Sequence, residues 1–271
     1  MTKRRKRNKL GRFAAVLLIL AGLGTAAFYG WQIYSTEKEY KEGDDAYEVI
    51  ARIAAPTEQK MEEPGEIPVL PVQEENVREI EENTVTIVDM EAVQEINDEI
   101  TCWLYSPDTV IDYPVCHGED NEYYLTHLAD GTYNRNGCLF VDCENAFDFS
   151  DDNTLIYGHH MASGSMFASL INYAEQSYYD AHPVMYLTVG SKIYRLEIFS
   201  GYTTTMDSDA YAMNWSTGQE FADWLWEISD RSDFVPQAMT ISTTDRIVTL
   251  STCAYSFQDA RYVVHGRLAE M

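Results

Sequence analysis

The chain has 271 residues, of which 45% are apolar and 13% aromatic, enough for a sizeable hydrophobic core. It carries 44 acidic and 19 basic residues, a formal net charge of -25, and the bases cluster at the N-terminus. Because an acidic chain repels polyanions, we expect no nucleic-acid partner.

The first predicted element is a membrane anchor. The run FAAVLLILAGLGTAAFYGWQI has 21 residues and no charge, close to the ~20 that a transmembrane helix needs. Residues 13–34 are therefore predicted to be a signal anchor, and the basic tail of residues 1–12 is expected to stay in the cytoplasm. A cleaved signal peptide is the alternative, since residues 25–27 are small. The aromatic residues that follow favour the uncleaved anchor.

Residues 35–85 are predicted to form an acidic extracellular stalk. Residues 37–54 have the composition of a short charged helix. Residues 55–83 contain four prolines, one glycine and many glutamates, a composition that cannot bury a core. We expect this segment to hold a folded domain, residues 86–271, away from the membrane.

The folded domain is predicted to be mainly β. Apolar residues at helical spacing predict an amphipathic helix at its start: Met90, Val93, Ile96 and Ile100. Seven short runs rich in β-branched and aromatic residues then predict strands: 110–115, 137–142, 154–159, 184–189, 192–202, 246–253 and 262–268. Two further helices are predicted at 165–175 and 216–230, the second with Ser216 or Thr217 as its cap. Many short strands with few helices indicate one β-barrel or β-sandwich domain.

Five cysteines are an odd number for an exported chain, so at least one thiol is expected to be unpaired within it. No C-x-x-C pair occurs, which argues against a zinc ribbon or a thioredoxin-type site. We expect no metal and no cofactor. Four of the cysteines are interpreted as small buried hydrophobic residues: Cys102, Cys116, Cys138 and Cys143.

The fifth cysteine, Cys253, is the candidate nucleophile. Alternation along the predicted strand places Thr249, Ser251 and Cys253 on one polar face, with the thiol at the strand end. A thiol attacks as the thiolate, which a nearby cation stabilises. Arg261, eight residues on, is placed to approach from a return strand, although it could instead pair with a surface acid.

A thiol nucleophile also needs a proton donor for the leaving amine, usually a histidine. His159 and His160 follow a predicted strand and Gly158, at a position open to a substrate. His265 is the rival, because it shares a strand face with Arg261. Spacing alone leaves this choice open. A metal site built on the adjacent histidines is disfavoured, since neighbouring side chains seldom converge on one ion.

These stretches together resemble the sortases, and within them class B. TLSTC is similar to the family's TLxTC signature, ARYVVHGRL to its arginine-bearing strand, and NTLIYGHHM to its histidine segment. The similarity continues through INDEITCWL, TVIDYPV, DNEYYL, GCLFVD and MFASLINY, and covers residues 86–271. It implies a closed eight-stranded β-barrel with an N-terminal helix and a second helix in the loop before the cysteine strand.

The resemblance also implies the chemistry. His159, Cys253 and Arg261 correspond to the catalytic residues, and Ser251 and Thr252 are expected to help bind the substrate. A membrane-anchored enzyme of this kind cleaves a C-terminal sorting signal of the LPxTG or NPxTN type after its threonine. It then transfers the acyl group from its cysteine to an amine of peptidoglycan or lipid II.

The expected partners are surface proteins that bear such a signal, at the outer face of a Gram-positive cell membrane. Residues 202–215 are expected to decide which sorting motif is bound. A pilin-polymerising enzyme and a non-catalytic wall-associated β-domain are the alternatives.

Overall fold

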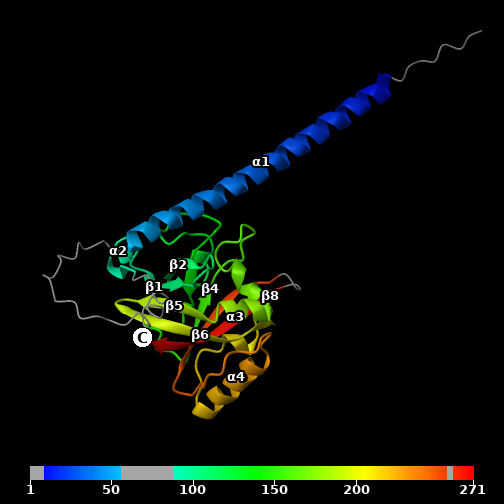
Figure 1. Cartoon of the computed structure of the whole chain (residues 1–271). Helices are drawn as coiled ribbons and strands as arrows, with labels where there is room; N and C mark the ends of the chain where they lie inside the picture. Colours follow the sequence, from blue (N-terminus) through cyan, green and yellow to red (C-terminus); the bar gives the residue numbers. More distant parts are fainter. Residues whose placement is uncertain (1–8, 56–87, 255–258) are drawn as a thin grey trace, which may run out of the picture.

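Eight strands close into a barrel in the order β1-β2-β3-β4-β7-β8-β6-β5 (Figure 1). The computed structural model describes residues 9–55, 88–254 and 259–271. The strands are β1 Ile100–Tyr105, β2 Asp112–Cys116, β3 Leu139–Val141, β4 Asn153–Tyr157, β5 Val184–Val189, β6 Lys192–Thr205, β7 Arg246–Cys253 and β8 Ala260–Glu270. The closed eight-stranded barrel that the sortase resemblance implied is confirmed.

The strand directions bring three chain segments to one rim of the barrel. Strands β4 and β7 are parallel neighbours, so their carboxyl ends lie side by side. Strand β8 pairs antiparallel with β7, and its first residues therefore lie beside the last residues of β7. The only other parallel pair among the described strands is β2 with β3. The rim at the end of β7 is where the predicted site residues meet.

Strands β2 to β8 fall within or close to the seven predicted runs, whereas β1 was not predicted. The amphipathic helix expected from residue 90 onward is α2 Met90–Gln94, which ends well before Ile100. Ile100 lies in β1 instead, where it is fully buried. Strand β1 pairs with both β2 and β5 and so closes the barrel. Tertiary pairing overrides the helical spacing here, in a segment whose sequence, ITCWLY, is rich in strand-forming residues.

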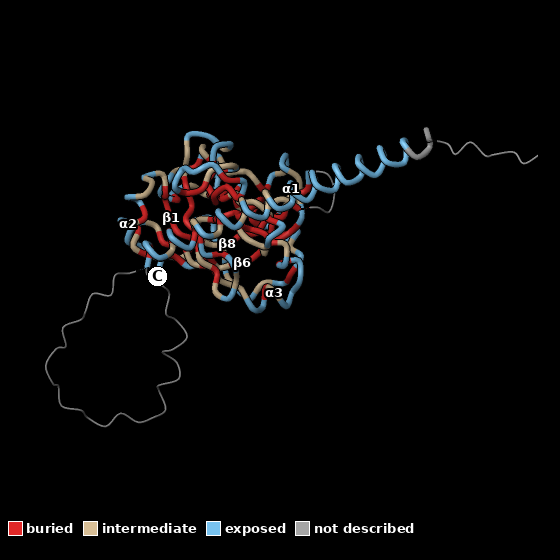
Figure 2. The backbone as a smooth tube through the Cα atoms, turned by 90° about the horizontal axis from the view of Figure 1, so that it is seen from above, coloured by how far each residue is buried: buried red, intermediate tan, exposed pale blue. Residues whose placement is uncertain are grey.

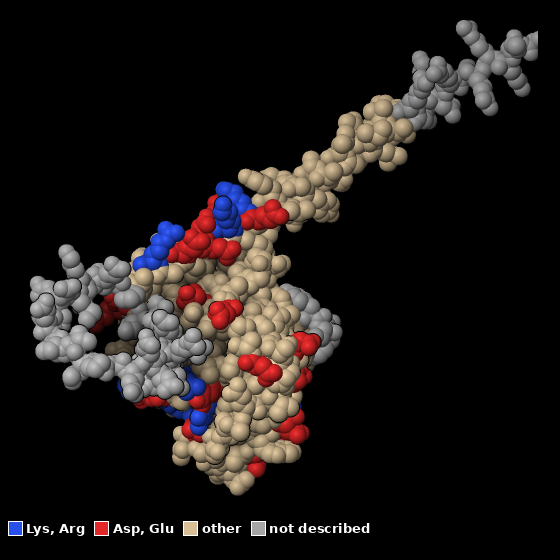
Figure 3. Space-filling view, viewed as in Figure 1, with Lys and Arg blue, Asp and Glu red and all other residues tan. Residues whose placement is uncertain are grey.

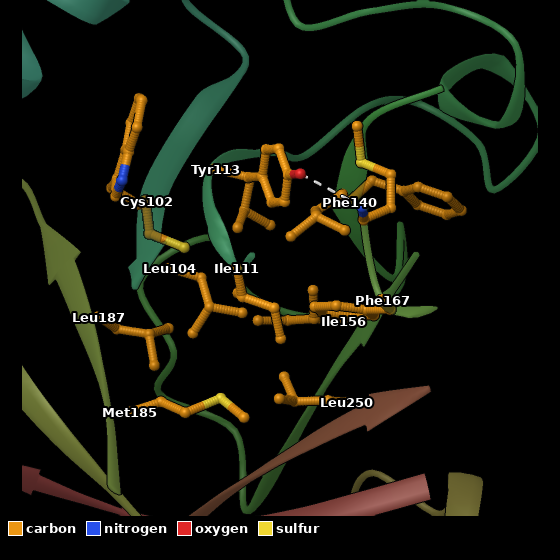
Figure 4. Close-up of a cluster of buried hydrophobic side chains, with 14 of the residues drawn as sticks. Cys102, Leu104, Ile111, Tyr113, Phe140, Ile156, Phe167, Met185, Leu187 and Leu250 are labelled. Carbon is orange, nitrogen blue, oxygen red and sulfur yellow. Dashed lines mark hydrogen bonds between the residues drawn. The ribbon is translucent and has the colours of Figure 1, made fainter. Parts of the chain in front are cut away.

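The barrel interior is filled with large apolar side chains, and the buried residues gather there along the backbone trace (Figures 2 and 4). Leu104, Ile156 and Leu250 are fully buried and converge from three strands. Tyr113 reaches across the same cluster, and its hydroxyl accepts a hydrogen bond from the Met166 amide at 3.3 Å. Close packing of this kind fixes the strand register that the rim depends on.

A second apolar cluster lies outside the barrel, under the helix α4 Gly218–Asp230. This helix was predicted at 216–230 with Ser216 or Thr217 as its cap. Thr217 is the cap. Its hydroxyl oxygen accepts a hydrogen bond from the Glu220 amide, and the Glu220 carboxylate accepts one from the Thr217 amide. Phe221 and Trp224 bury their rings against β6, β7 and β8 residues.

The helix predicted at 165–175 is only partly observed. Residues Ala168–Ala174 form the 3-10 helix η2, and Gln176–Ala181 form the short helix α3. Glu175, between them, is extended and interrupts the helical path. Two further 3-10 turns lie near the rim, η1 Tyr123–Leu125 and η3 Asp209–Tyr211.

The N-terminal helix α1, Lys9–Ala54, is continuous over 46 residues. Its first part extends away from the barrel, whereas its last turns lie against it (Figure 1). Tyr47, Ile50 and Ala54 are buried in the main core. The sequence assigned residues 37–54 to a stalk, but in the structure this end of the helix is docked. The basic tail and the proline-rich spacer fall largely outside the described residues.

Candidate active site

Strand register places the candidate nucleophile opposite the candidate cation. Cys253 is the last residue of β7 and pairs with Arg261 on β8. On the other side of β7, Ser251 pairs with Tyr157, the last residue of β4. Cys253 lies two residues after Ser251, and His159 lies two residues after Tyr157. Because parallel neighbours advance together, His159 follows Tyr157 to the end of β7 where Cys253 lies.

These three residues line one pocket of about 290 Å³ at the rim. Its walls come from β3, β4, β7 and β8, from η1 and the loop before it, and from the loop after β6 that contains η3. The lining residues are Asn121, Leu125, Phe140, Tyr157, Gly158, His159, Met206, Tyr211, Ser251, Thr252, Cys253 and Arg261. All five residues predicted for the site are therefore brought together.

The five cysteines differ in burial. Cys102, Cys116 and Cys138 are buried in the core, and burial raises the pKa of the Cys102 and Cys116 thiols well above the ordinary value. Cys143, which was expected to be buried, is partly exposed, as is Cys253. Burial, followed by the charge of Asp142, raises the pKa of Cys143. Cys253 is the thiol that lines the pocket.

The imidazole of His159 is held by a backbone carbonyl. Its Nε2 lies 2.7 Å from the Leu125 oxygen. A carbonyl only accepts hydrogen bonds, so Nε2 carries the proton and Nδ1 is the nitrogen open to proton exchange. No pattern in the sequence predicts this contact, because Leu125 contributes its backbone and not its side chain.

Gly158 explains why the chain can turn into the pocket at this point. A Cβ atom at Gly158 would lie 2.4 Å from Leu139 Cδ2 and 2.6 Å from Phe167 Cδ2, both buried. Its amide donates to the Ser251 oxygen at 3.1 Å, and its own oxygen accepts from the Thr252 hydroxyl at 2.9 Å. Only glycine fits between Leu139 and Phe167 at this position. The packing and the two hydrogen bonds to β7 fix the position of the next residue, His159.

The two rival histidines occupy different places. His160 points back to β7, where its Nδ1 lies 3.1 Å from the Cys253 carbonyl oxygen. His265 is fully buried under α4, with Nδ1 2.8 Å from the Thr249 hydroxyl. Burial, with a smaller effect of Arg231, lowers the pKa of His265 to about 3, so its ring is neutral at ordinary pH. Neither rival lines the pocket.

Arg261 contacts uncharged groups in this structure. Its Nη1 donates to the Ala260 oxygen at 3.1 Å, and its Nη2 lies 2.9 Å from the Met206 sulfur. Within residues 9–55, 88–254 and 259–271 it forms no ion pair. The guanidinium is thus not neutralised by a described carboxylate, although the chain is acidic.

Ser251 and Thr252 are buried beside the thiol, and both use their hydroxyls within the protein. Thr252 bonds the Gly158 oxygen, as described above, and Ser251 Oγ lies 2.8 Å from the Tyr211 hydroxyl. These bonds tie the end of β7 to β4 and to the loop after β6. Their first contribution is to fix the geometry around Cys253.

Sequence reasoning missed the aromatic wall of the pocket. Tyr157 and Tyr211 stack with ring centroids 6.3 Å apart. Burial raises the pKa of Tyr211, so its hydroxyl stays protonated. Tyr211 and Met206 do fall within residues 202–215, the segment expected to decide the sorting motif. Which of its side chains face the pocket depends on the path of a loop, and no periodicity in the sequence specifies that path.

Comparison with known proteins identifies the fold family. The family model for the sortase domain matches residues 104–269. The chain is 33% identical over 266 residues to sortase B of Listeria monocytogenes, which covers 96% of this chain and 98% of that protein.

Solved structures agree. Sortase B of Bacillus anthracis in complex with AAEK1 is 30% identical, with a TM-score of 0.69 over 87% of this chain and 100% of that one. A Staphylococcus aureus sortase B-substrate complex is 31% identical, with a TM-score of 0.63 over 67% and 84%. The chain therefore belongs to the sortases, and within them to class B, a group of cysteine transpeptidases.

Proposed function

We propose that Cys253 is the nucleophile, His159 the proton carrier and Arg261 the cation that binds substrate and stabilises the oxyanion. The observation that carries this proposal is their convergence: Cys253 and Arg261 are paired by strand register, and all three residues line one pocket. The planar donors of Arg261 suit a carbonyl oxygen that gains charge. Its contact with the neutral Met206 leaves the positive charge available to a substrate.

The substrate is a C-terminal sorting signal of the LPxTG or NPxTN type. The Cys253 sulfur attacks the threonine carbonyl carbon, and the bond to the following Gly or Asn nitrogen breaks. His159 Nδ1 takes up the proton of the Cys253 thiol as the sulfur attacks and passes it to that leaving amine, and a thioester remains on Cys253. The apolar and aromatic walls suit the uncharged part of such a signal, and the likeness to a sortase B-substrate complex supports a substrate bound by this fold.

An amine of peptidoglycan or lipid II completes the reaction. It attacks the thioester carbon and gives its proton to His159 Nδ1, which passes it to the released Cys253 sulfur, so that the starting state is restored. Ser251 and Thr252 hold β7 in place and present their backbone to the substrate.

We also propose that α1 crosses the cell membrane once through residues 13–34, with residues 1–12 in the cytoplasm and the barrel outside. Helix α1 is long and apolar enough to cross a membrane, although a signal sequence would meet the same criteria. Residues 13–34 are all exposed, and an apolar surface of that size needs an apolar environment. The helix continues unbroken into its docked end, which favours an anchor that is retained.

The test uses the full-length protein in detergent micelles with quenched peptides that carry LPxTG, NPxTN or SPxTG cores, with and without an amine acceptor. We expect one core to be cleaved and joined to the acceptor. Cys253→Ala should abolish both products, whereas Cys143→Ala, which removes the other partly exposed thiol, should retain them.

Replacing His159 with glutamine should also abolish turnover, and His160→Gln should reduce it far less. Turnover that survives Cys253→Ala would overturn the assignment of the nucleophile. If the unaltered protein cleaves none of the peptides, with or without the acceptor, the result would favour a non-catalytic β-domain.

A further inference from the structure

The docked end of α1 is tied to one turn of the barrel domain, residues 128–135. The Asn134 side-chain amide donates to the Glu39 oxygen at 2.9 Å, and the Arg135 amide donates to the Glu39 carboxylate at 3.2 Å. One residue on, the Asn136 amide group donates to the Tyr40 oxygen at 3.1 Å. The turn is therefore held at the level of residues 39 and 40.

The 128–135 turn is rigid. The Leu128 amide bonds the Thr132 oxygen at 2.9 Å, and the Thr132 amide bonds the Asp130 carboxylate at 2.8 Å. Tyr133 lies edge-on to His127, with ring centroids 5.7 Å apart. Even so, Tyr133 is 63% exposed. A large aromatic side chain is thus presented outward from a fixed backbone.

Tyr133 faces the aromatic residues that end the apolar part of α1. A hollow of about 540 Å³ lies between the helix and the turn, and Trp31, Tyr34 and Tyr133 all line it. Lys38, paired with Glu42 at 3.1 Å, contributes a cation to the same hollow. Figure 3 shows no charged side chain on α1 between its grey N-terminal part and the point where it approaches the barrel, and the sequence has none from residue 13 to residue 36.

Helix geometry sets the height of this hollow above the hydrocarbon. Tyr34 and Glu39 are five residues apart, or about 7.5 Å along the axis at a rise of about 1.5 Å per residue. The headgroup layer on each side of a bilayer is about 5 to 8 Å thick. The turn bound to Glu39 therefore lies at the outer edge of the headgroups when Trp31 and Tyr34 lie at the interface, where such residues are enriched.

We propose that the 128–135 turn rests on the bilayer that α1 crosses, with Tyr133 among the lipid headgroups. This inference rests on the proposed span. The helix anchors the enzyme at one point, and the turn supplies a second contact that fixes how the barrel is oriented on the membrane. Tyrosine suits the position, because its ring is apolar and its hydroxyl is polar.

The test places the photo-crosslinking residue benzoyl-phenylalanine at single positions of the full-length protein in nanodiscs of phosphatidylcholine and phosphatidylglycerol. Position 133 reports the turn, and position 31 reports the span. Position 226 is the matched control: Trp226 is 68% exposed but lies on α4, on the far side of the barrel from α1 (Figure 1). Lipid adducts are measured by mass spectrometry after illumination.

We expect lipid adducts at positions 31 and 133, with a yield at 133 several times that at 226. Adducts at 31 alone would overturn the contact and leave the span intact. Equal yields at 133 and 226 would overturn it as well, since the contact would not belong to the turn. No adduct at 31 would refute the span and, with it, the inference.

Discussion

Gly158→Ala should damage the site without touching any reacting group. The added Cβ would lie 2.4 Å from Leu139 Cδ2 and 2.6 Å from Phe167 Cδ2, whereas carbon atoms in contact sit about 3.5 to 4.0 Å apart. Both neighbours are fully buried, so neither side chain can swing into solvent. The backbone or the neighbours must move by about 1 Å to restore a contact distance.

The expected loss has two parts. Overpacking of this kind costs about 1 to 3 kcal/mol of unfolding free energy. A displacement of about 1 Å at the residue before His159 should lower turnover by about 100-fold, because the bonds of Gly158 to Ser251 and Thr252 set the spacing between β4 and β7.

Denaturant unfolding measures the first part, and cleavage of the best quenched peptide measures the second. Gly218→Ala is the matched control, because a Cβ there meets only Thr243 atoms at 3.8 and 3.9 Å. It should leave both quantities nearly unchanged. Unaltered stability and turnover in Gly158→Ala would refute the reasoning that close packing at this glycine positions His159.

Three further outcomes are expected. His265 has a folded-state pKa of about 3, so its stabilising effect is complete above its unfolded pKa of 6.5 and is lost as the pH falls toward 3. Between pH 7 and pH 5 the loss begins near pH 6.5 and so extends over about 1.5 pH units. At about 1.36 kcal/mol per unit, protonation of His265 should lower the unfolding free energy by about 2 kcal/mol. A His265→Gln variant with the same pH slope as the unaltered protein would contradict this. Thr217→Ala removes the cap of α4 and should cost about 1 kcal/mol in denaturant unfolding with turnover unchanged. Tyr47→Phe leaves the Gly137 oxygen without its buried donor and should cost about 1 to 3 kcal/mol, whereas the exposed Tyr133→Phe should cost nothing measurable in the same assay.

Most strands of the barrel were predictable because their side-chain content is local information. The runs that became β4, β7 and β8 combine β-branched residues with polar punctuation, and this pattern survives in the fold. The start of α4 was predictable for the same reason, since a cap is a local signal, although Ser216 and Thr217 remained alternatives until the structure showed Thr217. Strand β1 was not predictable, because apolar residues at helical spacing continue to Ile100. In the fold, Ile100 pairs with β2, and residues 103–105 pair with β5.

The features of the site also divide into those that local sequence predicts and those that tertiary packing decides. The sequence by itself determined that Cys253 ends a strand, that Arg261 begins the next one, and that a histidine follows Gly158. Only the tertiary structure placed His159 in the lining of the pocket and His265 in the core under α4. That placement depends on which strands are neighbours and on the path of α4 over them. Contacts between residues far apart in the chain leave no periodicity in the sequence, so packing alone specifies them.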